Sequence, residues 1–365
     1  MKLDLFGLTA RKVFFSYCVV CVFALLNPKA AADAQAFGSQ VQAQQGASIA
    51  RAGYPFVENS LKNRAQAGWL RYQETIGIPL AAWVRTALPA KITGTVFYPF
   101  SGPDFVTLAQ IFPDADRYVM VALQAAGKPA DPEKMSAVRA LNFQNKFLNE
   151  WLKFGRLGFY RTHDLNDDQV DDVSRIGVST IIKTFAVYSG FDVLDVFPIA
   201  FDPTTHSFER VSTDQWRSVR LLLSKEGKPV TIDYVSLDLS NGYLSQHPAI
   251  QEWLAREAAN PVLLKAASHL LQETYFSVLR DILIKQASLV VQDETGLNYE
   301  DLIRIGPVDL YGRFLFPHEL FNKNKQRSLA KAYVDSAASV KELPFAFSYN
   351  KSKDRNCLQV ARRGS

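Results

Sequence analysis

Residues 95–105, with the sequence TVFYPFSGPDF, decide the fold of this chain. The first of them form an apolar run typical of a buried strand, and Ser101-Gly102-Pro103-Asp104 is a tight turn before a short helix that reaches Phe112. A second apolar run follows at 117–123. Strand, turn, helix and strand within about thirty residues are typical of a βαβ unit, whose ligands lie at the carboxyl end of the first strand. The pattern therefore predicts a ligand-binding site at Ser101, Gly102 and Asp104.

A second polar turn follows another short apolar strand, at 288–292. The turn reads Asp293-Glu294-Thr295-Gly296, so two carboxylates come directly after the strand. If this strand is a neighbour of the first one, Asp293 and Glu294 share a crevice with Asp104. We therefore add Asp293 and Glu294 to the predicted ligand-binding residues.

The same residues also have a purely structural interpretation. Ser101 or Asp104 can cap the following helix by accepting hydrogen bonds from its free N–H groups. A serine nucleophile at Ser101, with Asp293 and His318 as partners, has the chain order of a hydrolase triad but lacks the first glycine of Gly-x-Ser-x-Gly. Capping, ligand contact and catalysis stay open at this point, and no catalytic residue is assigned.

No metal site and no cofactor are predicted. The run at 162–172 begins like a calcium loop, but Gln169 and Arg175 replace the glycine and the glutamate that such a loop needs. It is interpreted as the acid-rich start of a helix. The five histidines are not spaced as paired zinc ligands on a helix, and His269 is expected to be a packed core residue. These histidines are His163, His206, His247, His269 and His318.

The remaining pattern predicts a single α/β domain over residues 54–365. Its sheet is expected to be mixed and mainly parallel, with roughly six to eight strands, helices on both faces, a Rossmann-like start and an N-terminal helical cap. Helices are expected over two segments that end near Ile78 and Leu88, and at 131–154, 176–190, 261–287 and 325–336. Further strands are expected at 191–201, 216–224, 229–239, 343–349 and 358–361. Strands 216–224 and 229–239 are expected to form one hairpin, and strands 343–349 and 358–361 another.

Residues 1–36 are interpreted as an export signal. Lys2 and Arg11 precede an uncharged apolar run at 13–26, and the alanines that follow offer cleavage sites after Ala32, Ala34 or Ala36. The apolar run is shorter than the ~20 residues that a membrane span needs, so we expect cleavage and no span in the mature chain. Residues 37–53 then form a flexible leader, and the protein is expected in the periplasm or outside the cell.

The charge of the chain does not favour a nucleic-acid partner. The formal net charge of +5 is small for 365 residues. The densest basic run is Arg362-Arg363 near the C-terminus, which is interpreted as a solvated tail. A small-molecule ligand is therefore the expected partner, and the oligomeric state is not predicted.

Three short motifs carry a resemblance to known proteins. Residues 98–104 (YPFSGPD), 292–296 (QDETG) and 309–312 (DLYG) together resemble an uncharacterised family of exported bacterial proteins with a YPFSGPDF motif. The resemblance covers most of the mature chain and implies a periplasmic setting, but it implies no activity. The first unit also resembles the nucleotide-binding start of a methyltransferase-like domain. However, it has a single Gly102 beside Pro103, which lacks an N–H donor.

Two functions from different classes follow from these observations. The first is an exported α/β enzyme or binder with a small-molecule crevice around Ser101–Asp104. It predicts that the polar residues converge and that one carboxyl group has a raised pKa. The second is a non-catalytic envelope protein that presents a surface to a partner. It predicts that the same residues are used in capping and that an apolar patch is exposed elsewhere.

Overall fold

The computed structural model describes residues 55–89, 91–157, 176–318, 321, 326–347 and 356–364. All of them belong to one compact unit, Ser48–Ser365. The predicted export signal (1–36), the predicted leader (37–53) and the acid-rich run at 162–172 lie outside the described residues.

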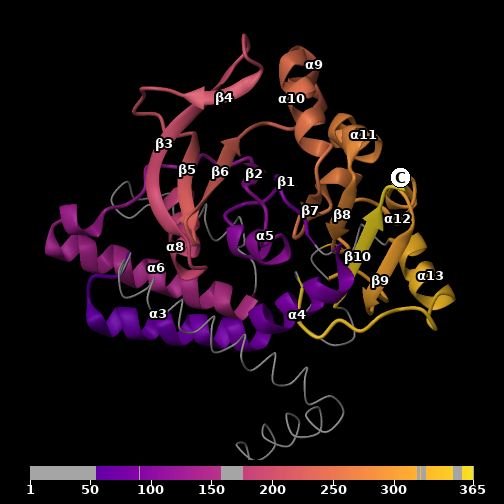
Figure 1. Cartoon of the computed structure of the whole chain (residues 1–365), viewed down its shortest axis with the longest axis horizontal. Coiled ribbons are helices and arrows are strands. Elements are labelled where there is room, and N and C mark those ends of the chain that lie inside the picture. The colour runs from indigo at the N-terminus through magenta and orange to yellow at the C-terminus, as the bar shows by residue number, and fades with distance from the viewer. Residues whose placement is uncertain are drawn as a thin grey trace, which may run out of the picture. The chain divides into compact units, whose positions relative to one another are not determined.

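The described strands form one sheet of ten strands (Figure 1). Their order across the sheet is β4-β3-β5-β6-β2-β1-β7-β8-β10-β9. In chain order the strands are β1 (Thr95–Pro99), β2 (Arg117–Ala122), β3 (Asp192–Asp202), β4 (Ser207–Arg210), β5 (Ser218–Lys225), β6 (Lys228–Ser236), β7 (Val262–Leu264), β8 (Leu289–Gln292), β9 (Val308–Gly312) and β10 (Cys357–Arg362).

The chain is an α/β protein with a mixed sheet, but the sheet is not mainly parallel as predicted. Four neighbouring pairs are parallel, and they join β6, β2, β1, β7 and β8 in the middle of the sheet. Five pairs are antiparallel, and they lie on either side of that block. On one side, short turns join β3 to β4 and β5 to β6, and strands joined in this way have to be antiparallel. The β5–β6 hairpin itself was predicted correctly.

Helices cover both faces of the sheet. Successive side chains of a strand point to opposite faces, and those of the central strands belong alternately to two separate hydrophobic cores. In β1, Val96 and Tyr98 enter the first core, whereas Phe97 enters the second. The first core is completed by α3 (Asn59–Tyr72), α4 (Ile78–Ala87), α5 (Phe105–Ile111), α6 (Ala137–Leu157) and α8 (Val178–Tyr188). The second is completed by α9 (Asn241–Gln246), α10 (Pro248–Ala258), α11 (Ser277–Gln286) and α12 (Tyr299–Leu302).

Helices α3 and α4 form one continuous segment through a π-helical turn, η1 (Gln73–Gly77). This segment and α6 lie together along one side of the sheet, and α9, α10 and α11 lie on the other (Figure 1). The side chains of Trp69 in α3 and Trp151 in α6 stack with their ring centroids 5.7 Å apart. Aromatic packing thus fixes the predicted N-terminal helices against the domain.

Short helical turns and one further helix complete the described elements. The 3-10 turns are η2 (Pro132–Lys134), η4 (Leu270–Gln272) and η5 (Thr274–Phe276), and the last helix is α13 (Arg327–Asp335). Helix α8 ends at Ser189-Gly190, as predicted, and Gly190 has the positive φ of 85° typical of a helix terminator. None of the helices in the described ranges has the length and apolarity that crossing a bilayer requires.

Three predictions about the C-terminal half were wrong. Residues 261–287 are not one helix, because 262–264 form β7 and only 277–286 form a regular α-helix. Strand β10 does not pair with 343–347 but lies between β8 and β9. Arg362 and Arg363 are not a solvated tail: Arg362 pairs with Asp309 at 2.6 Å, and Arg363 donates to the carbonyl oxygens of Ala287 and Ile284.

Candidate functional site

The five parallel strands place their carboxyl ends at one edge of the sheet. The turn after β1 carries Ser101, Gly102 and Asp104, and the turn after β8 carries Asp293 and Glu294. Strand β8 is not a direct neighbour of β1, because β7 lies between them. The residues that follow β7, which begin with Lys265, therefore separate the two predicted acidic turns.

Asp104 forms the centre of a buried polar cluster. Its Oδ1 accepts a hydrogen bond from the N–H of Thr107 at 3.3 Å and so caps α5. Its Oδ2 lies 2.6 Å from Nζ of Lys265, which also donates to Oγ1 of Thr107 at 3.0 Å. The carboxylate of Asp104 therefore acts both as a helix cap and as the partner of a buried ammonium group.

Burial raises the pKa of the Asp104 carboxyl group above its ordinary value of 3.8, and the adjacent Lys265 ammonium opposes this rise. Loss of hydration is the larger of the two effects because the side chain of Asp104 is only 5 % exposed. A carboxyl group with a raised pKa at the end of a strand is a common feature of functional sites, although structural ion pairs also have it.

Two tyrosines enclose this cluster. The hydroxyl of Tyr98 donates to the carbonyl oxygen of Lys265 at 2.9 Å, which joins β1 to the residue after β7. Tyr72, the last residue of α3, donates to Oε1 of Gln110 at 2.9 Å. Burial, and then the negative charge of Asp104, raise the pKa of Tyr72 well above its ordinary value. The π-helical turn begins directly after Tyr72, and such turns often occur at functional sites.

Asp293 fixes the loop that follows β7. Its Oδ2 accepts from the N–H of Ala266 at 2.8 Å, and its Oδ1 accepts from the N–H of Thr295 at 2.8 Å. The hydroxyl of Thr295 donates to the same Oδ1 and accepts from the N–H of Ala267 at 2.8 Å. Asp293 thus holds the turns after β7 and β8 together and does not contact Asp104.

Backbone strain is concentrated in the turns after β1 and β7. Phe100, Ala266, Ser268 and His269 have φ values between 52° and 59°, a region that side chains other than glycine rarely occupy. They are four of the seven such residues in the described part of the chain. Each costs on the order of 1–3 kcal/mol, and strain of this kind clusters at ligand-binding and active sites.

His269 lies in the strained loop and is almost completely buried, with 1 % exposure. Neither ring nitrogen has a hydrogen-bond partner in the part of the chain that the structure describes. Gln272 lies near enough to interact with the ring and opposes the effect of burial on the pKa of His269, but no ring nitrogen reaches it with the distance and angle of a hydrogen bond. The amide nitrogen of Gln272 donates to the carbonyl oxygens of Glu294 and Gly296. Burial lowers the pKa of His269 below its ordinary value of 6.5, so the ring is neutral at pH 7.

Glu294 belongs to a different polar cluster, which lies between β8 and β10. Its Oε2 is 3.6 Å from Sγ of Cys357, and both residues are fully buried. Cys357 also accepts a hydrogen bond from Gln359, whose Oε1 accepts one from Gln292 at 3.0 Å. Burial, followed by the charge of Glu294, raises the pKa of the Cys357 thiol well above its ordinary value.

Ser101 is buried, and within the described part of the chain its hydroxyl donates only to carbonyl oxygens, those of Gly102 at 3.0 Å and Val121 at 3.4 Å. Neither acceptor is the base that a serine nucleophile needs. Gly102 has a φ of 51°, and a Cβ atom there would meet no atom within 4 Å. Gly102 therefore faces open space at the end of β1. Within the described ranges, no cluster of three His, Cys, Asp or Glu side chains is suited to hold a metal ion.

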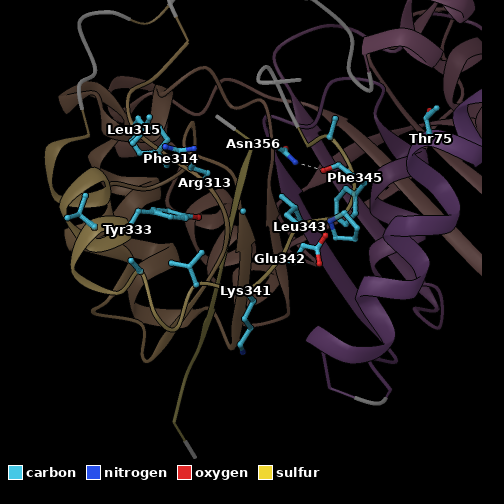
Figure 2. Close-up of a pocket in the computed structure, with 16 residues that line it drawn as sticks. Thr75, Arg313, Phe314, Leu315, Tyr333, Lys341, Glu342, Leu343, Phe345 and Asn356 are labelled. Carbon is cyan, nitrogen blue, oxygen red and sulfur yellow. Dashed lines mark hydrogen bonds between the residues drawn. The ribbon is translucent and has the colours of Figure 1, made fainter. Parts of the chain in front are cut away.

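An open groove of about 1030 Å³ lies elsewhere, between the residues after β9, helix α13 and residues 340–346. Figure 2 shows Leu315 and Tyr333 on one side of this groove and Leu343 and Phe345 on the other. The described lining includes none of the five predicted ligand-binding residues. Leu315 and Val334, which both line it, are 43 % and 66 % exposed.

Comparisons with protein-family models, with curated proteins and with solved structures found no match to this chain. The assignment of a function therefore depends on the chemistry of the strand ends. Lys265 and His269 are polar residues of this region that the sequence did not identify as site residues. One sequence feature could have identified Lys265: it is a lysine within the apolar run Val262-Leu263-Leu264-Lys265-Ala266.

Proposed function

We propose that the protein is exported and binds a small molecule at the strand ends around Ser101–Asp104, between the turns after β1 and β7. The observation that carries this proposal is the backbone strain of Phe100, Ala266, Ser268 and His269 in those two turns. Strain persists where the surrounding structure enforces it, and pre-organisation of a ligand site is a common reason. The raised pKa of Asp104 adds support, as the sequence-based hypothesis expected.

The order of the parallel strands supports a Rossmann-like organisation of this part of the sheet. Numbered along the chain, the parallel strands β1, β2, β6, β7 and β8 lie in the order 3-2-1-4-5. In open sheets of this kind, ligands bind where the strand order reverses, outside the carboxyl ends of the strands. Here that position lies between β1 and β7, where Asp104 and Lys265 meet.

A substitution at Gly102 tests the location of the ligand. Gly102→Asn adds a side chain in open space, and asparagine tolerates the positive φ better than other residues, so the variant is expected to fold. Gly190→Asn is the matched control, since Gly190 also has a positive φ and open space but ends α8. A chemically mixed library of small molecules is screened by thermal shift on the wild-type chain and on both variants.

We expect some compounds to raise the melting temperature of the wild-type chain and of Gly190→Asn, but not that of Gly102→Asn. The proposal fails if no compound stabilises the wild-type chain, or if Gly102→Asn responds to every compound as the wild-type chain does.

Export is proposed from residues 1–36 and from the resemblance of residues 98–104 to exported bacterial proteins. Expression in a bacterial host, followed by cell fractionation and mass spectrometry of the intact chain, tests it. We expect the protein in the periplasm or the medium, with an N-terminus that follows Ala32, Ala34 or Ala36. A cytoplasmic chain that keeps residues 1–36 contradicts export.

A non-catalytic interaction protein is the second candidate. The observation that favours it is that Asp104 and Asp293 already accept several hydrogen bonds from the protein itself, whereas Leu315 and Val334 are exposed beside a groove. A photo-crosslinking residue at Val334, compared with one at the exposed Leu194 in β3, distinguishes the candidates in the exporting host. A discrete cross-linked partner from Val334 alone favours the interaction protein.

A further inference from the structure

The position that binds phosphate in many doubly wound proteins is already occupied in this chain. Phosphate groups are held there by the free N–H groups at the start of the helix after the first strand. In this protein the carboxylate of Asp104 accepts the hydrogen bond from the N–H of Thr107. Pro103, directly before Asp104, has no N–H to offer. A phosphate in this position would have to displace a negatively charged group that belongs to the protein.

The charges around the strand ends also disfavour an anion. Lys265 is the cation at this position, and its ammonium group is already paired with Asp104 and hydrogen-bonded to Thr107. Asp293 and Glu294 add two further carboxylates on the neighbouring strand end. An anionic ligand would therefore meet unfavourable electrostatic interactions in a poorly hydrated region, where such interactions are strong.

The ring of His269 favours an uncharged ligand that can form hydrogen bonds. Its neutral imidazole has one nitrogen that donates and one that accepts a hydrogen bond. Neither nitrogen has a partner within the described ranges, and an unmade hydrogen bond of a buried group is unfavourable. A hydroxyl group can both donate and accept, so it is the simplest group that satisfies this ring. The neighbouring Ser268 is exposed, which brings the loop to the surface next to the buried ring.

We infer that the ligand of this site is an uncharged molecule with hydroxyl groups, of the monosaccharide or polyol class, that hydrogen-bonds to the His269 ring, and that phosphorylated ligands are excluded. This inference depends on the small-molecule function proposed above and specifies its ligand class.

Matched pairs of probes test the ligand class on the full chain. The pairs are D-ribose and ribose 5-phosphate, D-glucose and glucose 6-phosphate, and glycerol and glycerol 3-phosphate. Long-range ¹H–¹⁵N spectra of the histidine rings report binding directly at His269. The ring of His247 is an internal control, because it lies between α9 and α10 and its Nδ1 is 2.8 Å from the carbonyl oxygen of Tyr243 in α9. His269→Phe is compared with His247→Phe.

We expect at least one neutral probe to shift the His269 ring signals in a saturable manner and to leave those of His247 unchanged. Its phosphate ester should bind about tenfold more weakly or not at all, and His269→Phe, which keeps a ring but removes its donor and acceptor, should weaken the neutral probe about tenfold, the effect of one lost hydrogen bond. If His269→Phe does not fold, the ring signals of the wild-type chain still decide the outcome.

The remaining outcomes overturn the inference in distinguishable ways. If a phosphate ester binds as tightly as its neutral partner, the ligand class is wrong while the proposed binding function stands. If a neutral probe binds without a change at the His269 ring, the role of His269 is wrong, and a bound water is what satisfies the ring. If neither these probes nor the mixed library binds, the proposed function fails as well.

Discussion

Lys265 places its ammonium nitrogen 2.6 Å from Oδ2 of Asp104, and this ion pair joins the end of β7 to the end of β1. The side chains are 3 % and 5 % exposed. A buried pair of this kind gains little over an apolar pair of similar volume, but the loss of one partner leaves an uncompensated charge. The pair therefore couples the two strained turns on which the proposed site depends.

Replacement of Lys265 by methionine should destabilise the fold by about 3–5 kcal/mol, because Asp104 is left buried without its cation. Urea unfolding measures the free energy of unfolding. The double variant Lys265→Met with Asp104→Asn should recover most of this loss, since asparagine still caps α5. Lys341→Met, which removes the half-exposed pair between Lys341 and Asp309, is the control and should cost about 0–1 kcal/mol. Equal losses in the two single variants would contradict the role of burial.

Stability should fall as the pH is lowered below the ordinary histidine pKa of 6.5, in part because of His269. Burial lowers the pKa of this ring in the folded chain, so the unfolded chain binds the proton first, and protons then favour unfolding. Between pH 7.5 and 5.5, protonation of this ring in the unfolded chain lowers the free energy of unfolding by up to about 1.4 kcal/mol. His269→Gln should lose that part of the pH dependence in urea unfolding. Parallel curves for the variant and the wild-type chain would show that the ring titrates normally in the fold.

Ala266→Gly should stabilise the chain by about 0.5–1 kcal/mol, because glycine adopts the positive φ of this position without strain. Ala267→Gly is the matched control: Ala267 is not among the residues with positive φ and is buried. Ala267→Gly should lower the free energy of unfolding by about 1 kcal/mol, because glycine gives the unfolded backbone more entropy and removes a packed methyl group. Thermal unfolding of the two variants provides the comparison, and destabilisation by both would mean that position 266 carries no strain.

The thiol of Cys357 should not react in the folded protein. It is fully buried, and its pKa is raised by burial and by Glu294, so the reactive thiolate is scarce. With Cys18 and Cys21 replaced by serine, modification of Cys357 by a thiol reagent at pH 8 should be at least on the order of 10³ slower than that of a free thiol. The rate of modification should rise with the urea concentration in parallel with global unfolding of the chain. Fast modification in the native state would show that the β8–β10 cluster opens locally.

The elements that local signals specify were predicted from the sequence. The turn at Ser101–Asp104, the β5–β6 hairpin around Gly227 and the end of α8 at Gly190 each contain residues whose backbone preferences mark the position. For the same reason, the capping role of Asp104 was among the alternatives, and the structure has this cap. The assignment of five residues to a ligand remains a prediction, since no bound molecule tests it.

The elements that long-range pairing specifies were missed. Strand β7 has three residues, and an apolar run of this length does not distinguish a buried strand from a helix by periodicity. Its identity depends on β1 and β8, which flank it in the sheet but are distant in sequence. Lys265 and His269 were consequently assigned to a long helix, and their places at the strand ends became visible only once β7 was known. For Asp293 the turn itself was recognised from the sequence. Its position next to Asp104 was expected only if β8 neighbours β1, and β7 lies between these two strands.

The position of β10 has a consequence for how the protein is made. Strand β10 is the last described strand in the sequence, yet it lies between β8 and β9 and pairs with both. While the ribosome has yet to release this segment, β8 and β9 present open edges that can pair with other chains. The sheet can close at this position only after residues 357–362 have been synthesised. A chain that terminates before residue 357 should therefore aggregate or be degraded by proteases, and it should not fold into a smaller functional domain.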